Sequence, residues 1–253
     1  MRTLGVFDGV NGTISIIEDK ATGARRYYEG NAFQSHALPT GTSCFTYVHL
    51  MDGLLREASN ILLLGCAGGT LATMLHRQGK TVTVVDRNPQ SFALARDYFW
   101  MPKEIRCQTA DFRDFVAQTP DRFDGIGIDV GGPGFSPEAV FDGPALLALR
   151  RVLARNGRMA MNILVEDGMD PFTAGLACSL AGPDLNAWII EEANESERNA
   201  IIACAPEDRL RLEPRSMPAA IARDVSSWFV RRPQPGAAKS FPRAPLGLFG
   251  RSV

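Results

Sequence analysis

The sequence predicts an α/β protein whose mainly parallel sheet is closed by an antiparallel hairpin and preceded by a small β-rich appendage. Residues 1 to about 50 contain short alternating segments with turn signals at Asn11-Gly12 and Gly23. From Asn60 onward, apolar runs alternate with amphipathic stretches, the pattern that βαβ units around a parallel sheet produce. Two apolar runs, 187–192 and 199–204, then flank a polar turn and indicate the closing hairpin.

The composition is typical of a globular protein and excludes several function classes. The chain has 253 residues, of which 45% are hydrophobic and 22% charged, so it is not collagen-like, disordered or membrane-spanning. Because 27 Lys and Arg balance 28 Asp and Glu, no overall charge favours nucleic acid or a membrane as partner. We therefore expect no nucleic-acid and no membrane partner.

The cysteines and the N-terminus indicate the compartment. The five cysteines form no CxxC pair and lie in or beside apolar runs, which predicts reduced core thiols and no zinc site. The first residues lack the continuous apolar core of a signal peptide. We expect a cytoplasmic protein without a bound metal, and the sequence leaves open whether it forms a homodimer.

Changes in composition divide the chain into three regions. A β-rich appendage covers 1–52, with strands expected over Thr13–Ile17 and Arg25–Tyr28. An α/β core covers 53–224. The tail, 225–253, has five basic residues, four prolines and no acid, so we expect it to lack regular structure.

Local signals place the elements of the core. Gly79 and Gly157 stand where a glycine ends a helix, and Asn88 and Pro89 stand where an N-cap and a first helical residue belong. Apolar runs between these signals mark the strands. The expected strands cover 61–64, 81–85, 105–108, 125–128 and 158–163, and the expected helices cover 70–78, 89–99, 112–117, 144–155 and a stretch from 170.

A glycine-rich turn between the first core strand and its helix is the central functional feature. In Gly65-Cys66-Ala67-Gly68-Gly69, small residues let the backbone turn sharply and let a ligand approach the helix N-terminus. Asp86 ends the next strand, 21 residues after Gly65, where an acid accepts the hydroxyls of a ribose. Asp86 could also simply form the turn before Asn88. Because the glycine-rich turn and Asp86 follow neighbouring strands at matching positions, ribose binding is the favoured interpretation.

Two more acids follow strands of the same sheet. Asp111 comes directly after the third strand and Asp129 ends the fourth. Since ligands bind beyond the carboxyl ends of parallel strands, both acids are expected to line one crevice with Asp86. Asp111 is expected to bind an adenine amine with Phe112 near the ring, and it also stands where an N-cap would begin the next helix.

Seven segments resemble the spermidine synthase family of polyamine aminopropyltransferases, within the Rossmann-like S-adenosylmethionine methyltransferase fold. The resemblance extends from about Gln34 to Asn162. In that family a β-rich piece precedes a nucleotide-binding core, and decarboxylated S-adenosylmethionine donates an aminopropyl group to a diamine. The segments are Gln34-Ser35, CFTYVHLMDGLL, LLLGCAGGTL, VVDRNP, TADFRDF, DGIGIDVGGPG and LRRVLARNGRMAMN.

The resemblance implies a role for each matching residue. The co-substrate would be S-adenosylmethionine or its decarboxylated form, with no metal, and the partner would be a small-molecule amine or methyl acceptor. Asp129 would be the acid nearest the transferred group and the candidate base. The resemblance also places Gln34 and Tyr47 at the nucleotide and substrate pocket, Asp86 on the ribose and Asp111 on the adenine. From their positions in the sequence, Gly65, Ala67, Gly69 and Phe112 are added to the nucleotide side, and His49, next to Tyr47, and Glu138, after Gly134, to the substrate side.

Two departures affect the expected polyamine side. Family enzymes usually carry an acid where this chain has Gly68, and a second acid three residues after Asp129, where it has Gly132. A diamine is doubly charged near neutral pH and needs carboxylates to bind it and a base to free its lone pair. With Asp129 as the remaining acid, spermidine formation from putrescine is expected to be very slow or absent, unless Glu138 supplies the missing carboxylate.

Several alternatives stay open at this level. A methyltransferase fits the same nucleotide side, and the glycine at position 68 slightly favours a donor that keeps its own carboxylate. A non-catalytic nucleotide-binding protein also fits, whereas a nicotinamide oxidoreductase leaves Asp111, Asp129 and the terminal hairpin unexplained. Among the remaining residues, Trp188 and Trp228 are expected in the core or at an interface, and the acidic run from Glu191 to Glu197 is expected to be a solvated face.

Overall fold

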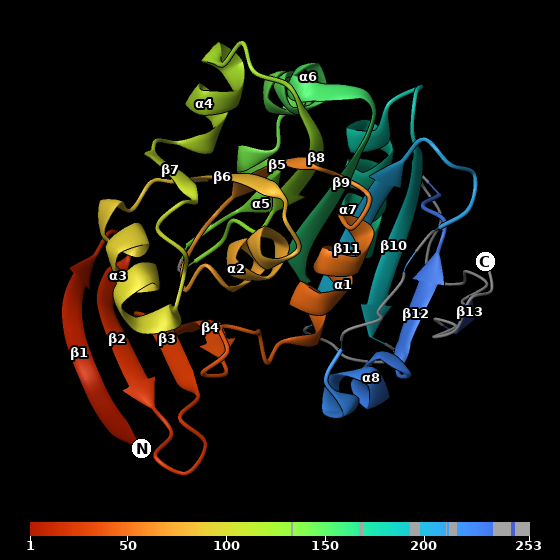
Figure 1. Cartoon of the computed structure of the whole chain (residues 1–253). Helices are drawn as coiled ribbons and strands as arrows, with labels where there is room; N and C mark the ends of the chain where they lie inside the picture. The colour runs from red at the N-terminus through yellow and green to blue at the C-terminus, as the bar shows by residue number, and fades with distance from the viewer. Residues whose placement is uncertain are drawn as a thin grey trace.

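The computed structural model of the chain contains two β-sheets, a small one at the N-terminus and a large central one (Figure 1). The structure describes residues 1–132, 134–166, 169–192, 198–210, 212, 217–234 and 244–245. The predicted fold class is confirmed: helices cover both faces of a mostly parallel sheet, an antiparallel hairpin closes it, and a separate β-rich piece comes first.

The small sheet is a four-stranded antiparallel meander in the order β1-β2-β3-β4. Its inner face packs on helix α3, where Ile14, Ile16 and Tyr27 form a cluster with Leu94 and Phe99. This contact fixes the sheet beside the core. Its strands are β1 (Arg2–Gly9), β2 (Gly12–Glu18), β3 (Arg25–Glu29) and β4 (Ala32–Ala37).

The large sheet has nine strands within the described residues, in the order β13-β12-β10-β11-β9-β8-β5-β6-β7. The five strands from β9 to β7 are mutually parallel, and β11, β10, β12 and β13 add to them in antiparallel pairs. The strands are β5 (Asn60–Leu64), β6 (Thr81–Asp86), β7 (Arg106–Thr109), β8 (Phe123–Ile128), β9 (Leu153–Val165), β10 (Asn186–Glu192), β11 (Arg198–Ala205), β12 (Trp228–Arg231) and β13 (Ala244–Pro245).

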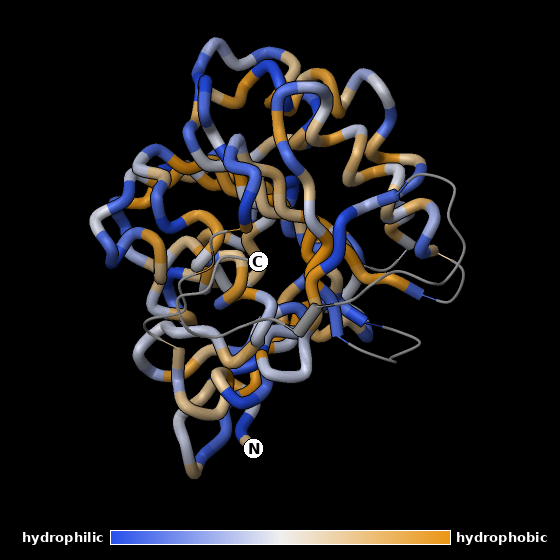
Figure 2. Tube along the Cα trace, turned by 90° about the vertical axis from the view of Figure 1, so that its right-hand side faces the viewer, coloured by the Kyte–Doolittle hydropathy of each residue, from blue (hydrophilic) through white to orange (hydrophobic). Residues whose placement is uncertain are grey.

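Two apolar clusters lie on opposite faces of the large sheet. Residues of α1, α2, α3 and α8 form one cluster, and residues of α4, α6 and α7 form the other. In Figure 2 the hydrophobic segments gather in the strands and helices at the middle of the molecule. The helices are α1 (Thr46–Leu54), α2 (Thr70–Arg77), α3 (Pro89–Phe99), α4 (Phe112–Gln118), α5 (Pro137–Val140), α6 (Gly143–Val152), α7 (Asp170–Ala181) and α8 (Ala219–Val225).

Helix α1 joins the two parts of the chain. It contacts α2, β9 and β11 and contributes buried residues to the core cluster, so it belongs to the core. The expected appendage boundary at residue 52 therefore falls inside a core helix. The other expected boundary, after residue 224, falls at the last turn of α8.

Two expectations about the end of the core are wrong. The helix expected over 144–155 stops at Val152, because β9 begins at once with Leu153 and carries Gly157 within it. The tail is not wholly irregular, since β12 pairs with β10 in the large sheet. Trp228 opens that strand with a side chain that is 1% exposed, and Trp188 is also buried, which confirms both tryptophans as core residues.

The acidic run is not a uniformly solvated face. Glu191 is only 1% exposed and accepts hydrogen bonds from Arg198, at 2.8 Å, and from Arg231, at 2.6 Å. Both arginines also reach Asp170 at the start of α7. The ion pairs tie three strands to one helix, and the part of the run at 193–197 lies outside the described residues.

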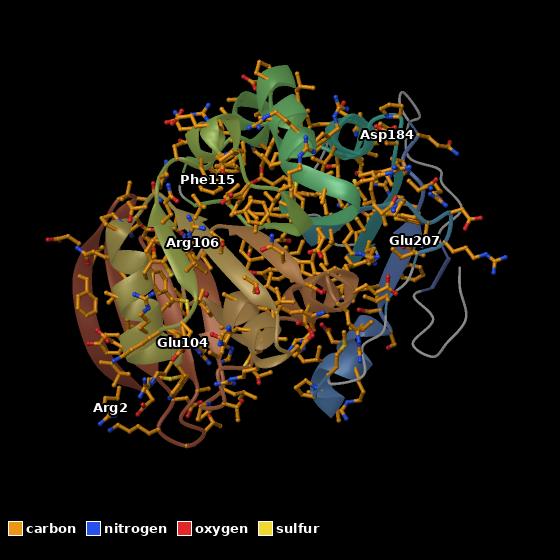
Figure 3. The ribbon with its side chains drawn as sticks, turned by 45° about the horizontal axis from the view of Figure 1, so that its top comes forward. Arg2, Glu104, Arg106, Phe115, Asp184 and Glu207 are labelled. Atoms are coloured by element: carbon orange, nitrogen blue, oxygen red, sulfur yellow. The ribbon has the colours of Figure 1, made fainter. Side chains whose placement is uncertain are left out.

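Some other charged side chains lie at the periphery. Arg2, Asp184 and Glu207 are on the outside of the molecule, with Arg2 and Asp184 far apart (Figure 3). All five cysteines are free thiols. Among the helices that the structure describes, none is long and apolar enough to cross a membrane.

Candidate functional site at the carboxyl ends of the parallel strands

A cavity of about 1110 Å³ opens where β5, β6, β7 and β8 end. The glycine loop and the strand ends form one side of it, and β3, β4 and the start of α1 contribute the other. The N-terminal sheet and the segment after it therefore cover the crevice at the strand ends. The sequence-predicted residues that line the cavity are Gln34, Tyr47, Gly65, Ala67, Gly69, Asp86, Asp111, Phe112, Asp129 and Glu138.

The glycine loop must be built from small residues because it passes close to its neighbours. Gly65 has φ +97°, and a Cβ there would lie 2.1 Å from the carbonyl oxygen of Asp129. Gly69 has φ +64° and stands at the N-cap of α2, where a Cβ would lie 2.7 Å from the sulfur of Met101. The loop therefore presents its backbone, rather than side chains, to the cavity.

Asp86 holds this loop in place. Its carboxylate accepts the backbone N–H of Cys66 at 2.8 Å and that of Asn88 at 2.7 Å. Burial raises the pKa of Asp86, and the two N–H bonds oppose that shift. Both interpretations of Asp86 are thus compatible: it shapes the turn before α3, and it faces the cavity next to the glycine loop.

The space at Gly68 is occupied by the N-terminal sheet. The Gly68 N–H donates to Ser35 Oγ at 3.0 Å, and a Cβ at position 68 would lie 2.9 Å from Ser35 Cβ and 3.0 Å from Phe99 Cδ1. An aspartate at this position would force these neighbours to move. Where the related enzymes carry a loop acid, the Ser35 side chain from β4 therefore fills the space in this chain.

Asp111 and Phe112 begin helix α4 at the edge of the cavity. Asp111 is the N-cap of α4 and accepts the N–H of Arg113 at 2.9 Å, which confirms the N-cap role expected from the sequence. Against the effect of partial burial, this bond and the Arg113 guanidinium lower the pKa of Asp111. Phe112 is buried and its ring packs 5.6 Å from that of Phe141, which makes one apolar wall.

Asp129 lies at the end of β8 and is held by two polar side chains. Asn162 Nδ2 donates to its Oδ1 at 2.9 Å, and the Tyr47 hydroxyl donates to its Oδ2 at 3.3 Å. Burial raises the pKa of Asp129, and these two hydrogen bonds oppose the shift. Burial and the neighbouring Asp129 together raise the pKa of Tyr47 well above its usual range. Tyr47 therefore remains a donor, and Asp129 is a fixed carboxylate facing the cavity.

The expectation that His49 lines the substrate side is wrong. His49 is 3% exposed, its Nε2 lies 2.8 Å from the carbonyl oxygen of Ser43, and it is not among the residues that line the cavity. The reason is helical geometry. Residues 47 and 49 both lie in α1, and two positions along a helix point in nearly opposite directions.

Gly132 and Glu138 mark the outer part of the site. A Cβ at Gly132 would lie 3.2 Å from Asn11 Nδ2 and 3.6 Å from Gln34 Nε2, so β4 and the β1–β2 turn reach this point. Glu138 is exposed on the short helix α5 and accepts a hydrogen bond from Ser136. Glu138 thus lines the cavity at its open side.

Several lining residues were given no role from the sequence. Asn162 is the penultimate residue of the expected strand 158–163, so its position near the other strand ends could have indicated that it lines the cavity. Ser35, Glu29, Phe33 and Phe45 belong to the appendage, where nothing local distinguishes a cavity-facing residue. Their positions depend on how the small sheet docks on α3.

The cavity is strongly acidic. Six acidic and two basic residues line it among those that the structure describes, so its charge favours a cationic ligand. Arg113 pairs with Asp111, and Arg87 donates to the side-chain amide oxygen of Asn11. The charged residues are Glu29, Asp86, Asp111, Asp129, Glu138, Glu166, Arg87 and Arg113.

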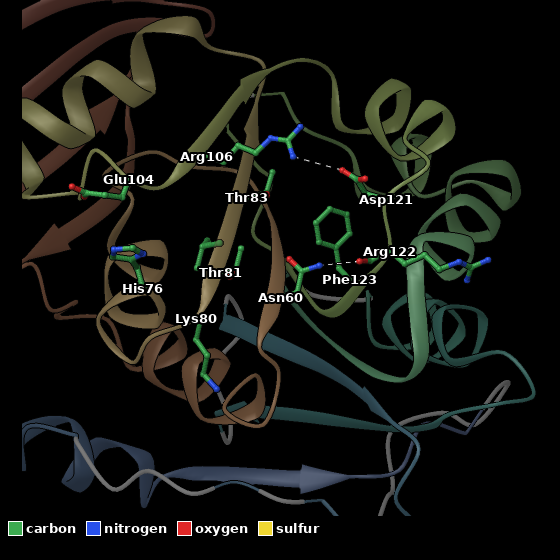
Figure 4. Close-up of a pocket in the computed structure, with 11 residues that line it drawn as sticks. Asn60, His76, Lys80, Thr81, Thr83, Glu104, Arg106, Asp121, Arg122 and Phe123 are labelled. Carbon is green, nitrogen blue, oxygen red and sulfur yellow. Dashed lines mark hydrogen bonds and ion pairs between the residues drawn. The ribbon is translucent and has the colours of Figure 1, made fainter.

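A second cavity, of about 440 Å³, lies at the opposite ends of the parallel strands (Figure 4). Several of its charged residues are engaged with protein groups: Arg106 pairs with Asp121 at 3.7 Å, and Lys80 donates to a backbone carbonyl. It contains none of the sequence-predicted site residues. Within the described part of the chain, no cluster of three His, Cys, Asp or Glu could hold a metal ion.

Comparison with solved structures identifies the class of fold. No protein-family model and no curated protein sequence matches the chain. A human methyltransferase-like protein 13 in complex with SAH has a TM-score of 0.50 at 18% identity, covering 73% of this chain and 85% of its own. The chain therefore shares the Rossmann-like S-adenosylmethionine methyltransferase fold.

Within that class, spermidine synthases are more similar. A probable spermidine synthase from Corynebacterium glutamicum has a TM-score of 0.74 at 18% identity, covering 92% of each chain. A spermidine synthase from Thermotoga maritima has a TM-score of 0.59 at 15% identity, covering 85% of this chain and 75% of its own. A third, in complex with the transition state analogue AdoDATO, has a TM-score of 0.62 at 14% identity, covering 85% and 75%. The resemblance in the sequence is confirmed at the level of fold.

Proposed function

We propose that this protein is a transferase that binds an adenosyl sulfonium nucleotide and moves its aminopropyl group to an amine acceptor. The observation that carries the proposal is the position of Asp129. Tyr47 and Asn162 fix this carboxylate in the same cavity as the glycine loop and Asp86. Such a reaction belongs to polyamine biosynthesis.

The nucleotide side is supported by backbone and carboxylate groups that face the cavity. The loop Gly65–Gly69 offers its backbone to an adenosine, and Asp86 is placed to accept ribose hydroxyls. Both Asp86 oxygens already accept an N–H, but a carboxylate oxygen has lone pairs for a second donor. Asp111 and Phe112 are assigned to the adenine, and Gln34 approaches from β4.

The acceptor side is supported by charge and by an aromatic wall. The rings of Phe33 and Phe45 meet edge to face at 5.0 Å, and those of Phe45 and Tyr47 stack at 5.6 Å. All three line the cavity, and the wall ends at the carboxylate of Asp129. Aromatic faces and carboxylates together attract alkylammonium groups, so an amine is the acceptor that fits best.

The chemistry needs positioning and one base. A bound sulfonium nucleotide supplies an electrophilic carbon next to its sulfur. Asp129 takes a proton from the acceptor amine, whose nitrogen lone pair forms the new bond to that carbon. The carbon–sulfur bond breaks with its electron pair on sulfur. Because burial raises the pKa of Asp129, this carboxylate is a stronger base than an ordinary aspartate and accepts a proton more readily near neutral pH.

A direct aminopropyl-transfer assay tests the proposal. Decarboxylated S-adenosylmethionine and a panel of amines, putrescine included, are offered to the wild type, Asp129→Asn and Glu138→Gln. We expect the wild type to transfer the group to at least one amine, Asp129→Asn to lose about 100-fold or more in rate, and Glu138→Gln to retain it. Full activity in Asp129→Asn would exclude Asp129 as base.

A methyltransferase is the second candidate, and the surroundings of Gly68 favour it. The hydroxyl of Ser35 occupies the place of a loop acid, so the loop offers no carboxylate to the ammonium of a decarboxylated donor. S-adenosylmethionine carries its own carboxylate and needs none there. Methyl transfer from labelled S-adenosylmethionine to the same amines, with no aminopropyl transfer, would favour this second candidate.

A further inference from the structure

We propose that Glu29, at the end of β3, is the second carboxylate of the acceptor site and binds the distal ammonium of a diamine. This inference rests on the proposed function and specifies its substrate class. The second carboxylate would then come from the N-terminal sheet, whereas spermidine synthases carry it after the strand that corresponds to β8. Glu29 is 4% exposed and nevertheless lines the cavity.

Among the residues that the structure describes, the hydrogen-bond partners of Glu29 are uncharged. Oε1 accepts the backbone N–H of Asn11 at 2.9 Å, and Oε2 faces the side-chain amides of Asn11 and Gln34, each at 3.4 Å. Burying a carboxylate is costly unless a positive charge compensates it. Arg87, the nearest arginine of this network, donates to the amide oxygen of Asn11 rather than to the carboxylate. A cationic ligand would supply the missing charge.

The geometry around Oε2 leaves room for competition by a ligand. A hydrogen bond of 3.4 Å is longer than the usual range for N–H to oxygen and is correspondingly weak. An ammonium group forms shorter, charge-assisted bonds to a carboxylate. The Oε2 atom is thus the part of Glu29 that an ammonium would engage.

The position of Glu29 matches the gap left by Gly132. The two amides that a side chain at position 132 would meet, those of Asn11 and Gln34, are the same two that contact Glu29 Oε2. The same two amides therefore connect the Glu29 carboxylate to the position where the chain departs from the spermidine synthase pattern, and the charge of Glu29 also acts on Asp86, whose pKa it helps to raise. The expectation of negligible diamine transfer assumed Asp129 as the remaining acid, and Glu29 removes that assumption.

Glu138 is the weaker candidate for the same role. It is exposed on α5 and already accepts a hydrogen bond from Ser136. A solvated carboxylate at the open side of a cavity binds an ammonium weakly, because water screens the pair. Comparison of Glu138→Gln with Glu29→Gln therefore decides which of the two carboxylates binds the ammonium.

Calorimetry with a diamine and a monoamine tests the inference. 1,4-Diaminobutane and 1-aminobutane are titrated into the wild type, Glu29→Gln, Glu29→Asp and Glu138→Gln, each with and without saturating 5′-methylthioadenosine. We expect Glu29→Gln to weaken diaminobutane binding roughly 10- to 100-fold, with aminobutane and the nucleoside unaffected. Glu29→Asp, which keeps the charge, should recover part of the affinity, and Glu138→Gln should change little.

The other outcomes separate the inference from the proposed function. Diaminobutane affinity that is unchanged in Glu29→Gln, or no diaminobutane binding by the wild type, would overturn the inference. An equal loss of affinity for 5′-methylthioadenosine in Glu29→Gln would overturn the inference too, because Glu29 would then bind the ribose or stabilise the fold. If the wild type binds diaminobutane through Glu29 but does not bind the nucleoside, the proposed function fails and the inference stands.

Discussion

Replacing Asp86 separates its structural role from its ligand role. In Asp86→Ala, the N–H groups of Cys66 and Asn88 lose acceptors at 2.8 and 2.7 Å. A hydrogen bond to a charged group contributes about 1.5–3 kcal/mol, so the two together correspond to roughly 3–6 kcal/mol of unfolding free energy. Asp86→Asn keeps one oxygen acceptor and should lose about half of that.

Nucleotide affinity gives the second readout on Asp86. Loss of the ribose contacts should weaken binding of S-adenosylhomocysteine by about 1–3 kcal/mol, or roughly 5- to 150-fold. Urea unfolding measures the first effect and calorimetry on the folded Asp86→Asn variant measures the second. Asp97→Ala, an exposed acid on α3, is the control and should change neither. Unchanged S-adenosylhomocysteine affinity in Asp86→Asn refutes the ribose role, and unchanged stability in Asp86→Ala refutes the loop role.

Three further predictions concern stability. Burial raises the pKa of Asp52 from 3.8 to about 6, so the native state is favoured while Asp52 is protonated and loses that stability as pH rises from about 4 to 6. Asp52→Asn should therefore be more stable than the wild type by up to about 3 kcal/mol at pH 7.5 and equal to it near pH 4, as measured by urea unfolding; a constant difference would contradict the cause. Glu191→Gln should cost about 3 kcal/mol or more, because Arg231 loses a buried carboxylate at 2.6 Å, and unchanged unfolding would show that the pair contributes nothing. Gly68→Asp should lower the thermal midpoint and Ser35→Gly should partly restore it, since their Cβ atoms would lie 2.9 Å apart; no rescue would place the strain elsewhere.

Much of the core could be predicted because its signals are local. Asn88 caps α3 by accepting the N–H of Gln90 at 3.0 Å, and Pro89 follows as the first helical residue, as their types predicted. The apolar runs became parallel strands because a strand buried on both faces needs no polar alternation. Since parallel strands end at one edge, Asp86, Asp111 and Asp129 could be placed in one crevice without knowing side-chain positions.

The remaining features depend on contacts between distant segments. The acidic run was expected to be solvated because the ion-pair partners of Glu191, Arg198 and Arg231, come from two other strands and cannot be recognised from the local sequence. His49 was assigned to the site because the α1 helix was not expected, and without it the opposite orientations of residues 47 and 49 could not be seen. Glu29 faces the cavity only because the small sheet docks on α3, which no local pattern specifies.

The measurement that tests the central claim most directly is the thermal midpoint of the wild type with S-adenosylmethionine, its decarboxylated form, 5′-methylthioadenosine, S-adenosylhomocysteine or NAD. A ligand that binds the native state at about 100 times its Kd adds roughly 2.7 kcal/mol of stability, which for a chain of this size corresponds to an increase of roughly 5 °C or more. We expect at least one adenosyl thioether or sulfonium compound to give this increase, NAD to give none, and Asp86→Asn to reduce it. No increase with any adenosyl compound, or an increase with NAD alone, would contradict the assignment of the cavity to an adenosyl sulfonium nucleotide.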